Sequence, residues 1–160
     1  ELSFKGIKRE LFGPNSYSEL FFLDEATALA AGHRPCAHCR RQRYNEFKRL
    51  WGIANGLPDS TAVSSPEIDK QLHLERASRS RTKILFSTNF SEVPDGTLIA
   101  LGTEAYLVWG GSLHKWSHHG YDTTWPLPPE DKVVQVITPQ TIVQMFKVGF
   151  KPLVHASIHS

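Results

Sequence analysis

The sequence has little of several features that define large classes of protein. Only two of its 160 residues are cysteine, which excludes a small scaffold held together by disulfides. Apolar runs are short, such as residues 20–23 and 98–101, and this excludes a membrane span in the sequence. The formal net charge is only +2, so total charge alone indicates no anionic partner. The first ten residues contain no apolar signal-peptide core, which favours a cytoplasmic protein, and the start at Glu1 fits a piece of a longer gene product.

Hydrophobic residues make up 40% of the chain and aromatic residues 11%, which is enough to build a core and excludes general disorder. The length fits one compact domain over residues 1–160. Three parts are expected within it. Residues 1–56 carry a Cys-x-x-Cys pair, residues 57–90 form a linker and a basic helix, and residues 91–160 form an antiparallel sheet with one helix.

Capping residues and apolar periodicity predict helices in the first half. Asp24 is typical of an N-cap, so a short helix is expected from Glu25 to Ala31. Apolar residues on one face predict a longer helix over residues 36–55. Ser65 as N-cap and Pro66 at the first helical position predict a third helix.

The second half changes to alternating patterns typical of strands, followed by a helix after Pro139. This order predicts an α+β fold, with an N-terminal helical part that carries a Cys-x-x-Cys turn and a small C-terminal antiparallel sheet with one helix. Strands are expected at residues 2–7, 19–23, 97–101, 105–109, 112–116, 133–137 and 150–155, and a turn at residues 13–16.

Cys36 and Cys39 have the spacing at which two thiolates bind one Zn²⁺ ion. His33 precedes them by three residues and is a candidate third ligand. His114 and His118 are alternative ligands with His-x3-His spacing. Two other readings stay open: a pair of free structural thiols, or a pair that is redox-active or forms a disulfide.

The segment around these cysteines runs from an aromatic-rich stretch through a short Ala-rich helix into His33-Arg34-Pro35-Cys36-Ala37-His38-Cys39. This order resembles the second half of the zinc-binding domain of Ada-type DNA-alkylation-repair proteins, over residues 4–41, and is similar to Cys-x-x-Cys segments of some bacterial nucleases. The Ada-type resemblance implies that the segment binds zinc and that the protein binds DNA. The chain as a whole also looks like a member of a large bacterial family, but that likeness implies no function. The earlier cysteine pair of the Ada domain has no counterpart, so Ada-type alkyl transfer and a four-cysteine site within one chain are not expected.

Basic residues crowd two segments, residues 34–49 and 70–83, which hold 11 of the 18 lysines and arginines. Such a stripe attracts phosphate groups, although an ordinary solvated helix face is the alternative. Tryptophan in the Gly-rich, His-rich stretch 109–121 offers base stacking. The candidate nucleic-acid-binding residues are Arg34, Arg40, Arg41, Arg43, Arg76, Arg79, Arg81 and Trp116.

The sequence thus predicts a nucleic-acid-binding protein, with DNA as the expected ligand and a zinc site. One alternative is a hydrolase that acts on phosphodiester or nucleobase bonds, with His73, Glu75, Arg76 and His118 as candidate catalytic residues. A structural or regulatory protein without catalysis is the other.

Overall fold

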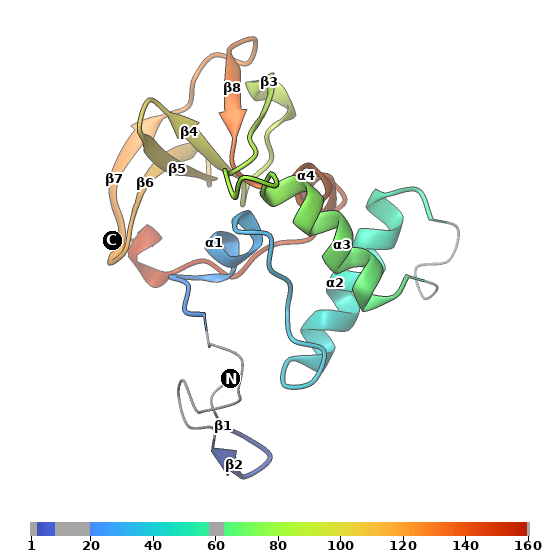
Figure 1. Cartoon of the computed structure of the whole chain (residues 1–160). Helices are drawn as coiled ribbons and strands as arrows, with labels where there is room; N and C mark the ends of the chain where they lie inside the picture. The colour runs from blue at the N-terminus through green and yellow to red at the C-terminus, as the bar shows by residue number, and fades with distance from the viewer. Residues whose placement is uncertain (1–2, 9–19, 58–62, 160) are drawn as a thin grey trace.

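The computed structural model of the chain describes residues 3–8, 20–57 and 63–159, and it confirms the α+β class. Three helices follow a short N-terminal hairpin: α1 (Glu25–Ala30), α2 (Arg41–Ala54) and α3 (Ser65–Arg76). A sheet follows, interrupted before its end only by a short 3₁₀ turn, and the fourth helix α4 (Gln140–Lys147) comes after the sheet. Figure 1 shows α2 and α3 on one side, the sheet on the other, and α1 and α4 between them.

The sheet has six antiparallel strands in the order β3-β8-β4-β5-β6-β7. The four consecutive strands β4 to β7 form a meander, and β8 returns to pair with the other edge of β4. The strands are β3 (Phe86–Asn89), β4 (Leu98–Leu101), β5 (Glu104–Trp109), β6 (Ser112–Ser117), β7 (Gly120–Pro126) and β8 (Val133–Val136). Near the N-terminus β1 (Ser3–Phe4) and β2 (Ile7–Lys8) form a separate hairpin.

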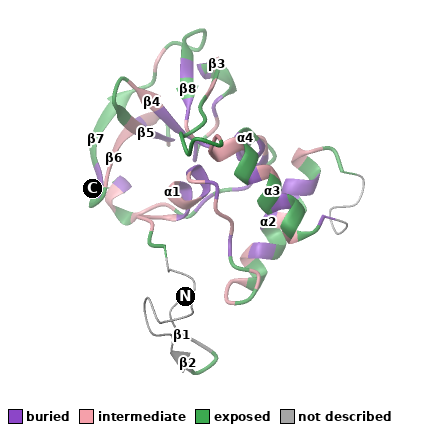
Figure 2. Ribbon diagram, viewed as in Figure 1, coloured by how far each residue is buried: buried purple, intermediate pink, exposed green. Residues whose placement is uncertain are grey.

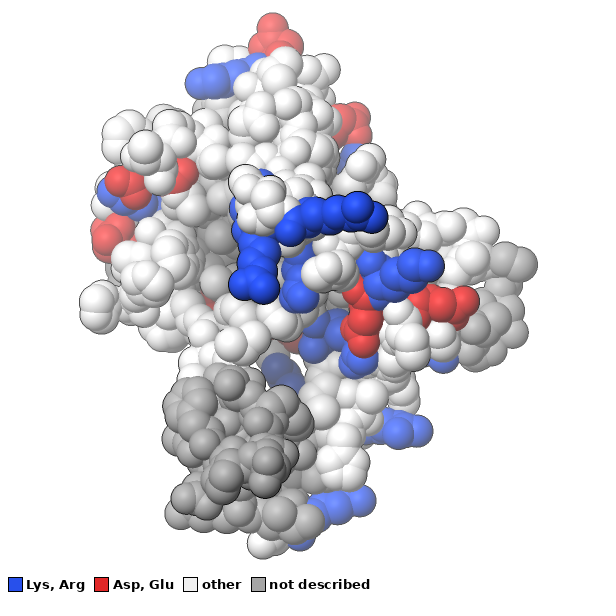
Figure 3. Space-filling model, viewed as in Figure 1, with Lys and Arg blue, Asp and Glu red and all other residues white. Residues whose placement is uncertain are grey.

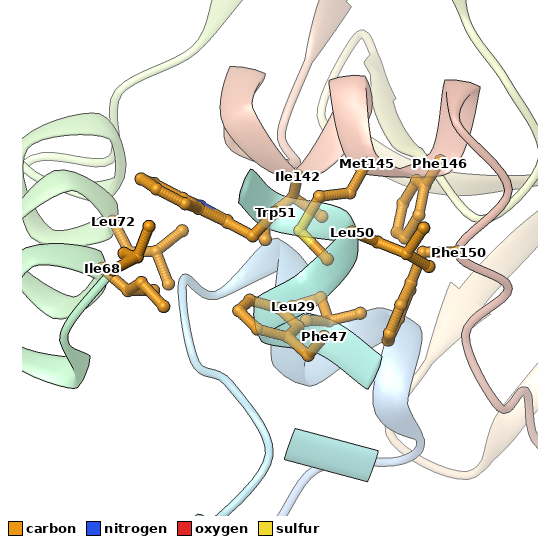
Figure 4. Packing of buried hydrophobic residues seen from close by; sticks show 11 residues of the cluster. Leu29, Phe47, Leu50, Trp51, Ile68, Leu72, Ile142, Met145, Phe146 and Phe150 are labelled. Atoms are coloured by element: carbon orange, nitrogen blue, oxygen red, sulfur yellow. The ribbon is translucent and has the colours of Figure 1, made fainter. Parts of the chain in front are cut away.

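Helix α4 joins the helical part to the sheet. Its residues Ile142, Met145 and Phe146 pack with α2 and α3 in a helical core, as Figure 4 shows. Val143, on another face of the same helix, belongs to the cluster that covers the sheet. Figure 2 shows α4 and the inner face of α2 as largely buried. The helical core and the sheet therefore share one short amphipathic helix, and this helix fixes their relative position.

Three predicted strands need correction. Residues 20–23 form no strand, and Leu20 and Phe21 are 63% and 64% exposed, because no neighbouring strand pairs with this apolar stretch. In place of the strand expected at residues 2–7, the described residues 3–8 form a hairpin of two short strands. Residues 150–155 are extended but unpaired, since carboxylates of the α1 segment take their backbone N–H groups. The prediction missed β3 and the polar, largely exposed β7. The turn expected at residues 13–16 lies outside the described residues.

Two helix starts also need correction. Helix α2 begins at Arg41 instead of residue 36, because residues 37–40 form a turn whose N–H groups point to the Cys36 sulfur. Helix α3 is capped by Ser64, one residue earlier than expected, in a capping box with Glu67. Within the described ranges, no helix combines the length and apolar character needed to cross a membrane.

Candidate functional site

A tight loop of basic residues follows α3, which ends at Arg76. Ala77 pairs with Lys83, and the N–H of Ser78 donates to the carbonyl of Thr82 at 3.0 Å, so the loop closes on itself. Arg79 and Arg81 lie at its exposed tip. We call residues 76–83 the basic loop. Figure 3 shows Lys and Arg side chains gathered where α3 ends and this loop begins.

Arg76 is held in place by a glycine. Gly32 has φ +76°, and a Cβ at this position would lie 2.7 Å from Arg76 Cδ, so only glycine lets the arginine stem lie against the backbone. The Arg76 guanidinium is 3.5 Å from His33 Nε2 and 3.4 Å from His73 Nδ1. Both contacts are long for hydrogen bonds, so most of the donor capacity of Arg76 stays free.

Arg76 lines a pocket of about 320 Å³ together with Gly32, His33, Arg34 and Asp69. Arg34 donates to both oxygens of Asp69, at 2.6 Å and 2.8 Å, and its guanidinium lies over the Tyr44 ring. This fork neutralises the pocket's carboxylate. Burial, and then the charge of Arg76, lower the pKa of His33 in spite of Asp69. His33 is therefore neutral at pH 7, and Arg76 supplies the uncompensated positive charge.

Lys83 closes the loop beside the same helix end. Its side chain is largely exposed, but its ammonium donates to the carbonyl of Ala30 in α1 at 2.8 Å. Desolvation at this position, and then repulsion from Arg76, lower the pKa of Lys83 to about 8. No carboxylate among the described residues forms an ion pair with Arg76, Arg79, Arg81 or Lys83. The loop is thus a concentrated, unneutralised positive charge.

We expect the Lys83 amine to react with acylating reagents several-fold faster than Lys70 or Lys132 at pH 8. About half of a lysine with pKa 8 is neutral at that pH, against well under about 1% of an ordinary lysine. Pulsed acetylation followed by peptide mass spectrometry measures the relative rates. Equal rates at the three lysines would show that the ammonium of Lys83 is not destabilised.

Two of the predicted phosphate ligands have structural partners. Arg34 is held by Asp69, and Arg43 lies in a nearly buried ion pair with Glu25, where Nη2 and Oε2 are 2.5 Å apart. Arg43 also donates to Glu46 and lies over the Phe150 ring at 4.0 Å. By contrast, Arg40 and Arg41 at the start of α2 form no ion pair with any residue that the structure describes.

The four candidate catalytic residues do not form one site. Glu75 accepts from the N–H and hydroxyl of Thr141 at 3.0 Å and 2.9 Å, so it caps the first turn of α4. His73 is exposed beside Arg76, whereas His118 lies in the turn after β6, with its ring against Trp116. The pocket contains Arg76 but none of the other three.

The Cys36 sulfur accepts the N–H groups of His38 and Cys39 at 3.4 Å and 3.5 Å. Partial burial opposes ionisation, but these N–H groups and the Cys39 side chain lower the pKa of the Cys36 thiol overall. His33 instead faces Arg76, and its ring lies against Phe22. His114 bonds to the Trp109 carbonyl. In the described part of the chain, no three His, Cys, Asp or Glu side chains are grouped as metal ligands.

The tryptophans of the sheet differ in exposure. Trp116 is half-buried against His118, and its indole nitrogen is buried without a hydrogen bond among the described residues. Trp125 on β7 is 52% exposed, and its ring forms a T-shaped pair with the ring of Tyr106. Asp69 and Lys83 were also absent from the predicted site. Lys83 was recognised only as a member of the basic segment 70–83. The partners of Asp69 and Lys83, which are Arg34 and Ala30, are distant in sequence, so no local signal indicated these contacts, whereas Gly32 was recognisable as a residue that ends a helix.

No protein-family model matches the chain, and no curated protein and no solved structure matches it either. The Ada-type resemblance of residues 4–41 therefore stays a prediction, and the geometry of the basic loop and its pocket is the basis for assigning a function.

Proposed function

We propose that the protein binds nucleic acid, with DNA as the expected ligand, through the basic loop, and that Arg40 and Arg41 at the start of α2 add further contacts. The observation that carries this proposal is the loop itself. Arg76, Arg79, Arg81 and Lys83 lie within eight residues of chain, and none of them pairs with a described carboxylate. Uncompensated cations of this kind gain free energy from phosphate groups by releasing counterions.

The closed geometry of the basic loop favours binding, because the loop backbone loses little conformational freedom when a ligand binds. Hydrogen bonds between Ser78 and Thr82 and between Ile84 and Arg76 already fix the backbone. The hydroxyls of Ser78, Ser80 and Thr82 form a chain at the tip and offer further phosphate contacts. The interface is a set of phosphate contacts without base-reading elements, so we expect little sequence preference.

Titration of labelled single- and double-stranded DNA and RNA at low salt tests the proposal. We expect binding that weakens steeply as salt increases, with similar affinity for unrelated sequences. Absence of binding at tens of micromolar protein would contradict the proposal and would leave the basic loop as an ordinary solvated surface.

We further propose that Cys36 and Cys39 bind zinc. The support is the pair of N–H groups that point to the Cys36 sulfur and its lowered pKa, since a thiolate is the form that binds metal. Two sulfurs are half of a tetrahedral set. His33, the expected third ligand, is turned toward Arg76, so the remaining ligands must come from elsewhere.

We expect purified protein to contain about one zinc ion per chain and to lose it in Cys36→Ser. Elemental analysis of protein prepared without chelator measures the ratio, and His33→Gln is the matched control that should keep the metal. A ratio of about one ion per two chains would indicate a site shared by two copies. Metal-free protein would rule out the zinc proposal and leave Cys36 and Cys39 as thiols without a metal.

A further inference from the structure

The pocket beside Arg76 has one positive charge in excess, with a second next to it. Asp69, the only carboxylate among its described lining residues, is neutralised by the fork of Arg34. Arg76 remains without a counter-ion among the described residues. The Lys83 ammonium donates to the carbonyl of Ala30, two residues before Gly32 of the pocket lining, and is repelled by Arg76. An anion in the pocket would relieve this repulsion. Arg76 and Lys83 together match an anion that carries two charges rather than one.

The hydrogen-bond donors of Arg76 are already held in position before a ligand binds. The Arg76 stem is fixed against Gly32, and its two terminal nitrogens make only long contacts to His33 and His73. The guanidinium can therefore present two parallel N–H groups to one anion without first breaking an ion pair. An arginine fork of this kind suits phosphate and carboxylate groups.

The volume of the pocket and the charge beside it limit which ligands fit. A volume of about 320 Å³ lies at the small end of ligand pockets, large enough for a phosphate group with an attached nucleoside. A phosphate inside a strand carries one negative charge, whereas a phosphate at the end of a strand carries about −1.5 to −2 at pH 7. The end phosphate is the better match to two adjacent cations.

We propose that this pocket binds the terminal phosphate of a nucleic-acid strand, held by the Arg76 fork, with Lys83 as the second cation. This inference rests on the proposed nucleic-acid binding and gives it a specific ligand: strand ends. Arg79 and Arg81, at the tip of the basic loop, then contact the phosphates that follow along the strand.

The experiment compares oligonucleotides of one sequence that carry a 5′-phosphate, a 3′-phosphate or only hydroxyl ends, titrated against the full chain at constant ionic strength. We expect one of the two phosphorylated forms to bind at least about tenfold tighter than the hydroxyl form, because a charged hydrogen-bonding pair is lost without the phosphate. Inorganic phosphate at millimolar concentration should remove this preference.

Arg76→Lys keeps the charge but loses the fork, so the preference should fall to less than about threefold while binding of the hydroxyl form is retained. Arg79→Gln is the matched control: it should weaken all three oligonucleotides equally and keep the preference. Melting curves of both variants verify that they fold. Equal affinity for all three oligonucleotides, or a preference that survives Arg76→Lys, would overturn the inference and leave the proposed function intact. Failure to bind any oligonucleotide would instead overturn the proposed function and, with it, this inference.

Discussion

Arg43→Met should destabilise the protein by about 3–5 kcal/mol and lower its melting temperature by roughly 6–20 °C. Only 6% of the Glu25 side chain is exposed, and Arg43 donates to both of its carboxylate oxygens. Without Arg43, this carboxylate stays buried with the Leu153 N–H as its remaining partner. The cost is therefore that of leaving a buried charge uncompensated.

The same ion pair anchors the C-terminal segment to α1. Arg43 also donates to the Lys151 carbonyl, and the N–H of Glu25 donates to the Leu153 carbonyl. Loss of Arg43 should therefore loosen residues 151–155 before the rest of the molecule, which hydrogen exchange measures. Glu25→Gln added to Arg43→Met should recover part of the stability, because it removes the stranded charge.

Thermal and urea melts of the single and double variants provide the measurement. Lys115→Met, in the more exposed pair with Glu104, is the control and should melt close to the wild-type temperature. A melting temperature for Arg43→Met equal to that of this control would show that the Glu25–Arg43 pair does not hold the fold together.

The second large effect is expected for DNA binding. Replacing Arg79 and Arg81 with Gln should weaken binding of double-stranded DNA about 10²-fold at 50 mM salt and flatten the slope of log K against log salt by about two units. Both side chains are exposed, and neither forms an ion pair with a described residue, so each phosphate contact should be lost without structural damage.

Two comparisons locate the interface. Arg40→Gln with Arg41→Gln should also flatten the slope by about two units, whereas adding Arg43→Gln should lower stability rather than change the slope further. Lys132→Gln, in the turn before β8, removes one exposed cation elsewhere and should leave the slope nearly unchanged. If Lys132→Gln weakens binding as much as the loop variants do, binding reflects total charge rather than the basic loop.

The sequence by itself determined the local structure. Asp24 as a cap, Pro66 in the first turn of α3 and the apolar face after Pro139 fixed three helices, because capping and periodicity act within a few residues. The meander β4–β5–β6 was equally readable, since its turns lie between adjacent alternating segments. These features sufficed for the α+β class.

Only the tertiary structure decided which basic residues are free. In the sequence, Arg34, Arg41 and Arg43 look alike. In the fold, Arg34 forms an ion pair with Asp69, which is 35 residues away in the sequence, and Arg43 forms one with Glu25. Arg41 is exposed. The role of residues 150–155 changed for the same reason, because two carboxylates at the start of α1 replaced a neighbouring strand as their partners. Hydrogen bonds and ion pairs between distant segments depend on which surfaces the core brings together, and spacing along the chain does not encode that.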